Sequence, residues 1–132
     1  MCGIAGYIGF EKLSKTKICR AKDLLINRGP DSQKSLSFSV GETNYELIHS
    51  RLSIIDINTR SDQPFIKNNC IIIFNGEIYN YLELRKKLER KGVTFTTNSD
   101  TEVLLESYAL YGPDCVKSFE GMWSFALFDK RR

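Results

Sequence analysis

The chain has 132 residues, 42% hydrophobic and 27% charged, which suits a single soluble domain with a core of its own. Its net charge of +3 is too small to indicate a nucleic acid or an anionic membrane as a partner. No stretch approaches the roughly 20 apolar residues of a membrane helix. The N-terminus also lacks a secretion signal, so we expect a cytoplasmic protein with no membrane contact. The four cysteines, Cys2, Cys19, Cys70 and Cys115, form no CxxC pair, which argues against a disulfide framework and a zinc site.

Hydrophobic periodicity divides the chain into strands and helices. In chain order we expect a strand at 3–9, a helix over Lys15–Asn27, strands over Gln33–Val40 and Tyr45–Ile55, a strand over Cys70–Phe74, a helix over Tyr79–Lys91, a strand over Val93–Thr97, a helix over Thr101–Tyr111 and a strand over Met122–Phe128. Strands that come in adjacent pairs, with helices between some of them, favour the α+β class over a regular series of parallel βαβ units.

Two places in this pattern carry further expectations. The run from Cys70 to Phe74 is continuously apolar, and Asn75-Gly76 directly after it is a turn signal, so we expect the strand to end there. The sequence stops at Lys130-Arg131-Arg132, just after an apolar strand that would need a partner. We therefore expect the chain to be a fragment of a longer one.

Cysteine at position 2 is the first candidate for chemistry. When Met1 is removed, Cys2 becomes the N-terminal residue and carries a thiol and a free α-amine together. An unperturbed α-amine has a pKa of about 7.7–8.0 and can act as a base near neutral pH. A nucleophile beside its own N-terminal amine is one form of activated nucleophile. A cysteine at this position can also arise by chance, so Cys2 alone does not decide the matter.

Polar residues that interrupt apolar strands form a second group of candidates. Arg51 offers a planar fork suited to a carboxylate ligand, although a surface arginine at a strand end fits the pattern as well. The Asn75 amide beside the Gly76 N–H would supply the two donors of an oxyanion hole, and the alternative is an ordinary Asn-Gly turn. His49, the only histidine, could pair with a cysteine, but a strand histidine is more often packed and hydrogen-bonded. Ser99 to Glu102 opens a helix, so some of these residues are expected to cap it.

Segments along nearly the whole chain resemble the glutamine amidotransferase domain of the asparagine synthetase type, a class II amidotransferase and N-terminal nucleophile hydrolase. The segments are MCGIAG (1–6), RGPD (28–31), HSRLSIID (49–56), QP (63–64), FNGEIYNY (74–81), SDTEVLL (99–105) and FEGMWSFALFD (119–129), and they follow the family's order and spacing. Both NGEIYN and RLSIID favour this branch over the related enzymes that aminate sugar phosphates.

The resemblance implies catalytic roles for three residues. Cys2 would be the nucleophile that attacks the side-chain amide carbon of glutamine, with its own α-amine handling the proton. The Asn75 side chain and the Gly76 N–H would hold the oxyanion and also contact the substrate. Ammonia would leave, and water would release glutamate from a thioester on Cys2.

The resemblance also implies how the substrate is held. Arg51 would bind the α-carboxylate of glutamine, and Glu77 and Asp100 would bind its α-ammonium group, so that a zwitterionic ligand meets both signs of charge. The main chain of Leu52, Ser53, Ile54 and Ile55 would form a wall of the pocket.

The fold implied by the resemblance is a four-layer αββα sandwich of two antiparallel sheets, the N-terminal nucleophile hydrolase fold. We expect residues 1–132 to form this one domain, incomplete at its C-terminal end and without the synthetase domain that follows it in the family. ATP and Mg²⁺ belong to that absent domain, so we expect no cofactor and no metal here. The expected partners are L-glutamine and a synthetase domain or partner chain that accepts ammonia, with a homodimer as a further option.

The sequence thus predicts a glutamine amidotransferase domain that releases ammonia, which in the full-length type serves the ATP-dependent conversion of aspartate to asparagine. A second hypothesis keeps the glutaminase but changes the acceptor to a sugar or another precursor. A third is an inactive, truncated binding or regulatory module. The intact candidate residues argue against this third hypothesis, whereas the early end of the chain favours it.

Overall fold

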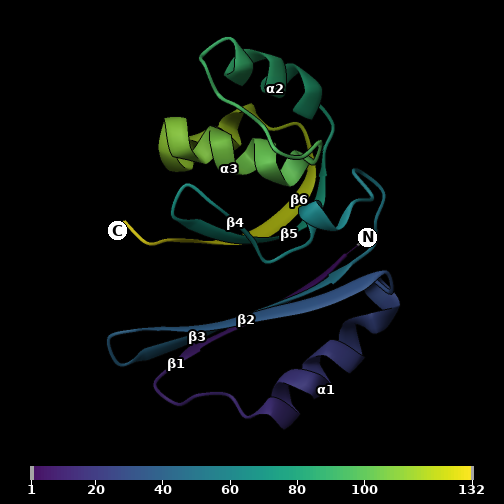
Figure 1. The fold of residues 1–132 in the computed structure, drawn as a ribbon, viewed down its shortest axis with the longest axis vertical. Helices are drawn as coiled ribbons and strands as arrows, with labels where there is room; N and C mark the ends of the chain where they lie inside the picture. The colour runs from purple at the N-terminus through teal and green to yellow at the C-terminus, as the bar shows by residue number, and fades with distance from the viewer. Residues whose placement is uncertain (1, 132) are drawn as a thin grey trace.

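Two antiparallel sheets face each other and carry helices on their outer sides. The computed structural model describes residues 2–131, so Met1, and with it the expected removal of that residue, lies outside the described residues. From one side to the other, the layers are helix α1 (Lys15–Leu25), a three-stranded sheet, a second three-stranded sheet, and helices α2 (Tyr81–Glu89) and α3 (Asp100–Tyr111) (Figure 1). The predicted α+β class and αββα layering are confirmed.

Strand β3 is the central strand of the first sheet. Strands β1 (Gly3–Gly9) and β2 (Ser32–Val40) flank β3 (Thr43–Arg51) in the order β1-β3-β2. Helix α1 packs on this sheet and begins at Ser14, whose hydroxyl accepts a hydrogen bond from the Lys17 N–H, as expected of an N-cap. A 3₁₀ turn over Ile26–Arg28 follows α1.

The prediction for β3 was too long. This strand ends at Arg51 rather than Ile55, because the residues that follow turn away and their carbonyl groups accept hydrogen bonds from the Arg51 guanidinium. The strand at 3–9 is confirmed in position, but of its residues Gly3 alone is buried.

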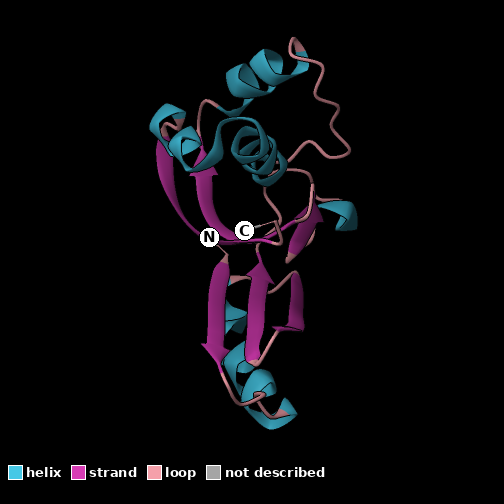
Figure 2. Cartoon of the chain, turned by 90° about the vertical axis from the view of Figure 1, so that its left-hand side faces the viewer, coloured by secondary structure: helices cyan, strands magenta, loops and turns pink. Residues whose placement is uncertain are grey.

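The second sheet contains β4 (Phe65–Lys67), β5 (Cys70–Ile78) and β6 (Gly121–Asp129) in the order β4-β5-β6. Figure 2 shows the two sheets as separate layers, with α2 and α3 on the far side of this second sheet. The sequence pattern did not predict β4, because three residues are too few to show an alternation. A 3₁₀ turn over Thr59–Ser61 precedes β4.

Strand β5 does not end at Asn75-Gly76, and this prediction was wrong. It continues to Ile78, with Asn75 opposite Ser124 and Gly76 opposite Trp123 in β6. Gly76 has φ 154, and a Cβ there would lie 2.4 Å from the carbonyl oxygen of Met122. Glycine is therefore required here for the close approach of two strands rather than for a turn.

The segment 93–97 is not a strand, which corrects another prediction. The N–H groups of Thr96 and Thr97 donate to the carboxylate of Glu102 at 2.6–3.1 Å instead of to a neighbouring strand. Glu102 is fully buried and also pairs with Lys67 Nζ at 2.6 Å. Although burial would raise the pKa of Glu102, these donors lower it from 4.5 to about 2. A buried carboxylate thus replaces a strand partner.

Helix α3 is confirmed and begins at a complete cap. The Ser99 hydroxyl accepts from the Glu102 N–H at 3.2 Å, and Gly112 ends the helix with φ 66, an angle that favours glycine. A 3₁₀ segment, Gly112–Ser118, leads from α3 to β6.

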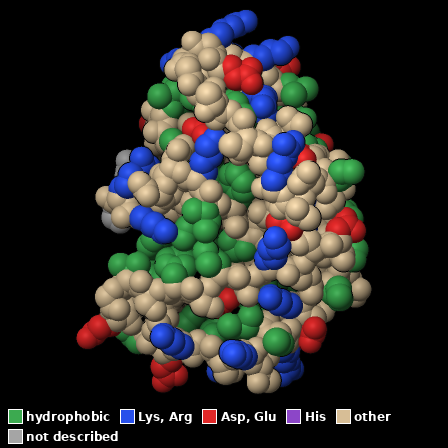
Figure 3. Space-filling model, viewed as in Figure 1, with side chains coloured by type: hydrophobic (Ala, Val, Ile, Leu, Met, Phe, Trp, Pro, Cys, Tyr) green, Lys and Arg blue, Asp and Glu red, His purple; other side chains and the backbone are tan. Residues whose placement is uncertain are grey.

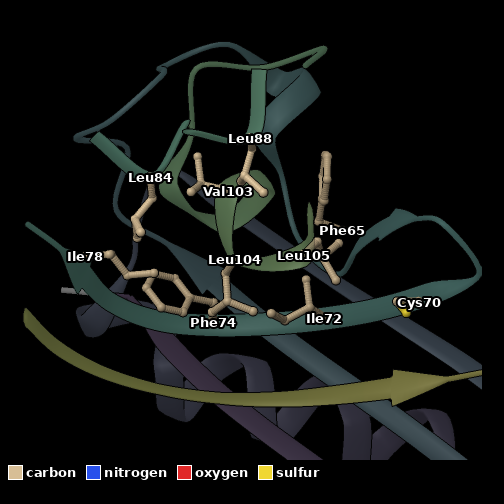
Figure 4. Packing of buried hydrophobic residues seen from close by; sticks show 10 residues of the cluster. All are labelled: Phe65, Cys70, Ile72, Phe74, Ile78, Leu84, Leu88, Val103, Leu104 and Leu105. Atoms are coloured by element: carbon tan, nitrogen blue, oxygen red, sulfur yellow. The ribbon is translucent and has the colours of Figure 1, made fainter. Parts of the chain in front are cut away.

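The main core lies between the second sheet and the helices. Figure 4 shows its side chains filling the space between β5 and α3. The buried members are Phe65, Cys70, Ile72, Phe74, Ile78, Leu84, Leu88, Val103, Leu104 and Leu105. The first two turns of α3 are buried on nearly every side. The core therefore holds the N-terminal end of this helix beside β5.

A smaller core joins the two sheets. Leu47 of β3 packs there with Ile71 and Ile73 of β5. The rings of Phe38 and Tyr45 stack at a centroid distance of 4.9 Å, and Phe128 meets both edge to face at 4.8–4.9 Å. On the face seen in Figure 3, hydrophobic side chains gather at the level between the sheets, with Lys and Arg around them. Among residues 2–131, no helix is long and apolar enough to cross a bilayer.

Ile72 tests the main core. Its side chain is fully buried, so Ile72→Ala should lower the free energy of unfolding by about 2–5 kcal/mol through lost burial and a cavity. Ile66 in the neighbouring strand is 54% exposed, and Ile66→Ala should cost no more than about 1 kcal/mol. Urea unfolding followed by circular dichroism measures both. Equal losses would contradict the described core.

Gly76 tests the close pairing of β5 and β6. In Gly76→Ala the new methyl would meet the β6 backbone at 2.4–2.5 Å, so we expect a loss of at least about 2 kcal/mol in unfolding free energy. Gly6→Ala is the matched control, because a Cβ at Gly6 would lie an ordinary 3.4 Å from its nearest neighbour. A Gly76→Ala protein as stable as Gly6→Ala would show that the strands are not in this contact.

Candidate active site

One pocket brings together most of the residues that the sequence singled out. It lies where the start of β1, the end of β3, the end of β5 and the start of α3 meet, and its volume of about 100 Å³ gives room for a ligand of amino-acid size. The predicted site residues that line it are Cys2, Arg51, Leu52, Ile54, Ile55, Gly76, Glu77 and Asp100. These residues come from distant parts of the sequence, so the fold rather than any one segment makes the site.

Cys2 directly precedes β1, and it lines the pocket. The Leu52 N–H donates to Cys2 Sγ at 3.4 Å, and Sγ lies 3.7 Å from the Leu52 carbonyl oxygen. The Arg28 Nε–H donates to the Cys2 carbonyl at 3.4 Å. These contacts hold the sulfur beside the first residue of the 52–55 wall.

Arg51 lines the pocket, but its guanidinium is already well bound. Its Nη1 donates to Asp62 Oδ1 at 2.6 Å and to the Asn58 carbonyl at 3.0 Å, and Nη2 donates to the carbonyls of Ile55 and Asp56. The side chains of Arg51 and Asp62 are each only 6% exposed. Within residues 2–131, Nε of Arg51 has no hydrogen-bond partner, so that edge of the fork is the one left for a ligand.

Asp62 is the buried counter-ion of this arginine. Burial would raise the pKa of Asp62, but hydrogen bonds from Lys34 and Arg51 hold it below its ordinary value. Breaking a buried pair of this kind by removing one partner is costly, because the other charge is left uncompensated. The orientation of Arg51 is therefore fixed by the protein before any ligand binds.

Two further carboxylates hold the wall that follows Arg51. Asp31 Oδ2 accepts from the Ser53 N–H at 2.7 Å, and Asp56 Oδ2 accepts from the Asn98 N–H at 2.7 Å. The Gly29 backbone allows this approach, since a Cβ there would lie 2.2 Å from the Ser50 carbonyl oxygen. The RGPD segment is thus a support for the pocket wall. Ser53 itself does not line the pocket, because its N–H is turned to Asp31.

Asn75 and Gly76 lie on the strand edge of the pocket. Gly76 lines it, whereas Asn75 does not appear in its lining. Asn75 Oδ1 is buried without a hydrogen-bond partner in the described chain. A buried amide without a partner is unusual in folded proteins, and it leaves both ends of the Asn75 side chain uncommitted beside Gly76.

Asp100 and Glu77 are the two acidic residues that line the pocket with Arg51. Asp100 Oδ2 accepts from the Ile78 N–H at 3.2 Å, which ties the start of α3 to the end of β5. Burial raises the pKa of Asp100 to about 6, and the nearby Glu77 also raises it. Two carboxylates that share a site resist ionising together, so this corner favours binding a cation.

His49 belongs to the packing between the sheets. It is 1% exposed, and its Nε2 lies 3.1 Å from the carbonyl oxygen of Phe74 in β5. Burial lowers the pKa of His49 to about 4, so the ring is neutral near pH 7 and Nε2 donates to that carbonyl. This is the packed, hydrogen-bonded role that the sequence favoured over a Cys–His pair.

Several residues that line the pocket were not predicted to belong to the site. These include Gln63, Phe74, Tyr79, Ser99, Thr101 and Met122. Gln63 and Thr101 lie in two of the segments that carry the family resemblance. Each is a polar residue to which that resemblance assigned no role in the site, and this was the only sign in the sequence that they belong to it. Among residues 2–131, no group of three or more His, Cys, Asp or Glu side chains is placed to hold a metal ion.

Comparison with known proteins shows which family the chain belongs to. The sequence profile of a family described as "Glutamine amidotransferase domain" matches residues 1–132. A putative asparagine synthetase [glutamine-hydrolyzing] 2 of Methanocaldococcus jannaschii is 38% identical over 149 residues, covering 100% of this chain and 28% of that protein. Asparagine synthetase [glutamine-hydrolyzing] 3 of Bacillus subtilis is 39% identical, covering 100% and 22%. Asparagine synthetase [glutamine-hydrolyzing] 1 of Arabidopsis thaliana is 41% identical, covering 99% and 22%.

The chain spans 22–28% of the length of these three relatives, and the family profile covers it from end to end. With the sheets, the pocket and the Cys2 thiol placed as described, the chain belongs to the glutamine amidotransferase domain family.

Proposed function

We propose that this domain hydrolyses the side-chain amide of glutamine through Cys2. The observation that carries the proposal is that Cys2, Arg51, Gly76 and Asp100 line one pocket of amino-acid size. A free amino acid carries a carboxylate and an ammonium group, and the pocket offers an arginine edge on one side and two carboxylates on the other. This charge pattern suits an amino acid better than a neutral amide or a peptide interior.

In the first step, the thiolate of Cys2 attacks the δ-carbon of the bound glutamine. The negative charge that develops on the amide oxygen would be held by the Gly76 N–H and by the side-chain amide of Asn75, turned with its NH₂ toward the oxygen. The α-amine of Cys2, free once Met1 is removed, takes the thiol proton and passes it to the departing nitrogen. The C–N bond breaks, ammonia leaves, and a γ-glutamyl thioester remains on Cys2.

In the second step, water attacks the thioester, with the same α-amine accepting its proton. The C–S bond breaks, glutamate is released and the Cys2 thiol is restored. No separate histidine is needed, which agrees with the burial of His49 away from this role. Arg51 would hold the α-carboxylate through its uncommitted edge, and Asp100 with Glu77 would hold the α-ammonium group.

The acceptor of the ammonia is also part of the proposal. The relatives named above are called glutamine-hydrolyzing asparagine synthetases, so we propose that ammonia from this domain serves the amidation of aspartate. ATP and Mg²⁺ would act in a synthetase domain or partner chain outside these residues. Nothing in the pocket favours a sugar acceptor or a purely regulatory module.

Covalent labelling tests the nucleophile. The glutamine-mimicking electrophile diazo-oxo-norleucine should form a single adduct on Cys2, in a chain that begins at Cys2, because that thiol alone among the four cysteines lines the pocket. Peptide mass spectrometry locates the adduct. Cys2→Ala should abolish ammonia release from glutamine. Labelling at Cys19, Cys70 or Cys115, or ammonia release by Cys2→Ala, would refute the assignment.

The raised pKa of Asp100 predicts a pH dependence of glutamine binding. The ammonium group of glutamine pairs with ionised Asp100, and below about pH 6 this carboxyl holds a proton that binding must expel. Affinity should therefore fall as pH decreases through 6, by up to about tenfold per pH unit. Calorimetry of glutamine binding to Cys2→Ala between pH 5 and 7.5 measures this.

Asp100→Asn, in the same Cys2→Ala background, is the control for that pH dependence. It should bind glutamine more weakly at pH 7 and lose most of the dependence between pH 5 and 7. An affinity of the parent protein that stays level across this range would argue against an ionic role for Asp100.

A further inference from the structure

A buried line of hydrogen bonds connects the three elements that carry the pocket. The His49 ring of β3 donates to the carbonyl of Phe74 in β5 at 3.1 Å. The Phe74 N–H donates to Gln63 Oε1 at 2.6 Å, and Gln63 Nε2 donates to Thr101 Oγ1 of α3 at 3.1 Å. The three side chains are 1%, 6% and 3% exposed. The backbone N–H and C=O of one residue of β5, Phe74, are thus both held by buried side chains.

The position of Gln63 explains why its side chain takes this role. Strand β4 pairs with β5 so that Phe65 lies opposite Ile72, and the same register extended by two residues would put Gln63 opposite Phe74. β4 begins only at Phe65, and Pro64 before it has no N–H to donate. The side-chain oxygen of Gln63 therefore accepts the bond that a neighbouring strand would have accepted.

Three residues of this line are close in sequence to residues of the proposed site. Phe74 directly precedes Asn75-Gly76, Thr101 directly follows Asp100, and His49 lies two residues before Arg51 on the same face of β3. The line does not touch the reacting atoms. It fixes how far the oxyanion donors of β5 stand from the carboxylate at the start of α3.

We propose that Gln63 is a positioning residue that sets the spacing between β5 and α3, and through it the affinity of the site for the amino-acid part of the substrate. This inference rests on the proposed glutaminase function. Gln63 Oε1 accepts from the Phe74 N–H, and Gln63 Nε2 donates to the Thr101 hydroxyl. Because a hydroxyl can also donate, only its removal is certain to break the second contact. Thr101→Val therefore keeps the first contact and removes the second, which frees the start of α3 to move relative to β5.

The test is the inactivation kinetics of the full chain by diazo-oxo-norleucine. Thr101→Val should raise KI, the reagent concentration for half-maximal inactivation, on the order of tenfold, since one buried hydrogen bond is lost. The maximal rate, kinact, should change less than about threefold, because the β5 side stays in place. Alkylation of Cys2 by iodoacetamide, which has no amino-acid part, should keep its rate.

Gln63→Met has no amide group, removes the same contact from the other side together with the contact to Phe74, and supplies a second variant if Thr101→Val fails to fold. It should raise KI at least as much, and the double variant should be no worse than Gln63→Met alone, because Gln63→Met has already removed the bond that Thr101→Val removes. Additive effects of the two substitutions would overturn the proposal.

Gln33→Met is the matched control for Gln63→Met. The Gln33 amide also bridges two elements, donating to the Lys22 carbonyl of α1 at 2.7 Å and to the Ser50 hydroxyl of β3 at 2.9 Å, but it does not line the pocket. Its loss should lower stability and leave KI unchanged. A KI shift as large in Gln33→Met, or none in folded Gln63→Met and Thr101→Val, would overturn the proposal. A parent chain left unlabelled at Cys2 would instead refute the glutaminase function itself, and this inference with it.

Discussion

The close pairing of β5 with β6 is the constraint on which the pocket depends. β5 runs straight through Asn75-Gly76, and at Gly76 the partner backbone comes so near that no side chain fits between the strands. This contact holds an N–H and a side-chain amide at one edge of a rigid sheet. Donors fixed in this way need little rearrangement when charge develops on a bound carbonyl oxygen, which is the condition under which such donors are most effective.

Charge in the pocket is arranged by partners that lie behind it. Arg51 would be an expensive isolated cation at 6% side-chain exposure, and Asp62 together with the carbonyls of the following loop compensates it. On the other side, Asp100 receives an N–H from Ile78 but no cation within residues 2–131. The charge of Arg51 is thus compensated by groups of the protein, whereas Asp100 has no cationic partner within residues 2–131. An amino acid that brings its own ammonium group supplies that partner.

The sequence predicted elements whose signal is local and missed those decided by contacts. Helix α3 was placed within one residue because Ser99 and Gly112 mark its ends chemically. The turn expected at Asn75-Gly76 failed because Gly76 is used for close approach to Met122, a contact 46 positions away that no local pattern reveals.

The same distinction applies to the strand expected at 93–97 and to the site. Segment 93–97 is rich in residues that favour strands, but the N–H groups of Thr96 and Thr97 donate to the Glu102 carboxylate. Strand propensity alone does not predict this contact. Family resemblance, rather than periodicity, pointed to Cys2, Arg51 and Asp100 as neighbours. It said nothing of the bonds that orient them, because Asp62 and Gln63 act through other residues and not on a ligand.

Glu102 gives the domain a built-in limit of acid tolerance. The folded chain holds the pKa of this carboxyl at about 2, against 4.5 for an ordinary glutamate, so unfolding in acid takes up a proton there. The stabilisation is complete above about pH 4.5 and disappears as the pH falls toward 2. Because Glu102 fastens residues 96–97 to the first turn of α3, the helix end that bears Asp100 would be the part loosened by its protonation. A residue that does not line the pocket therefore sets the lowest pH at which the pocket keeps its structure.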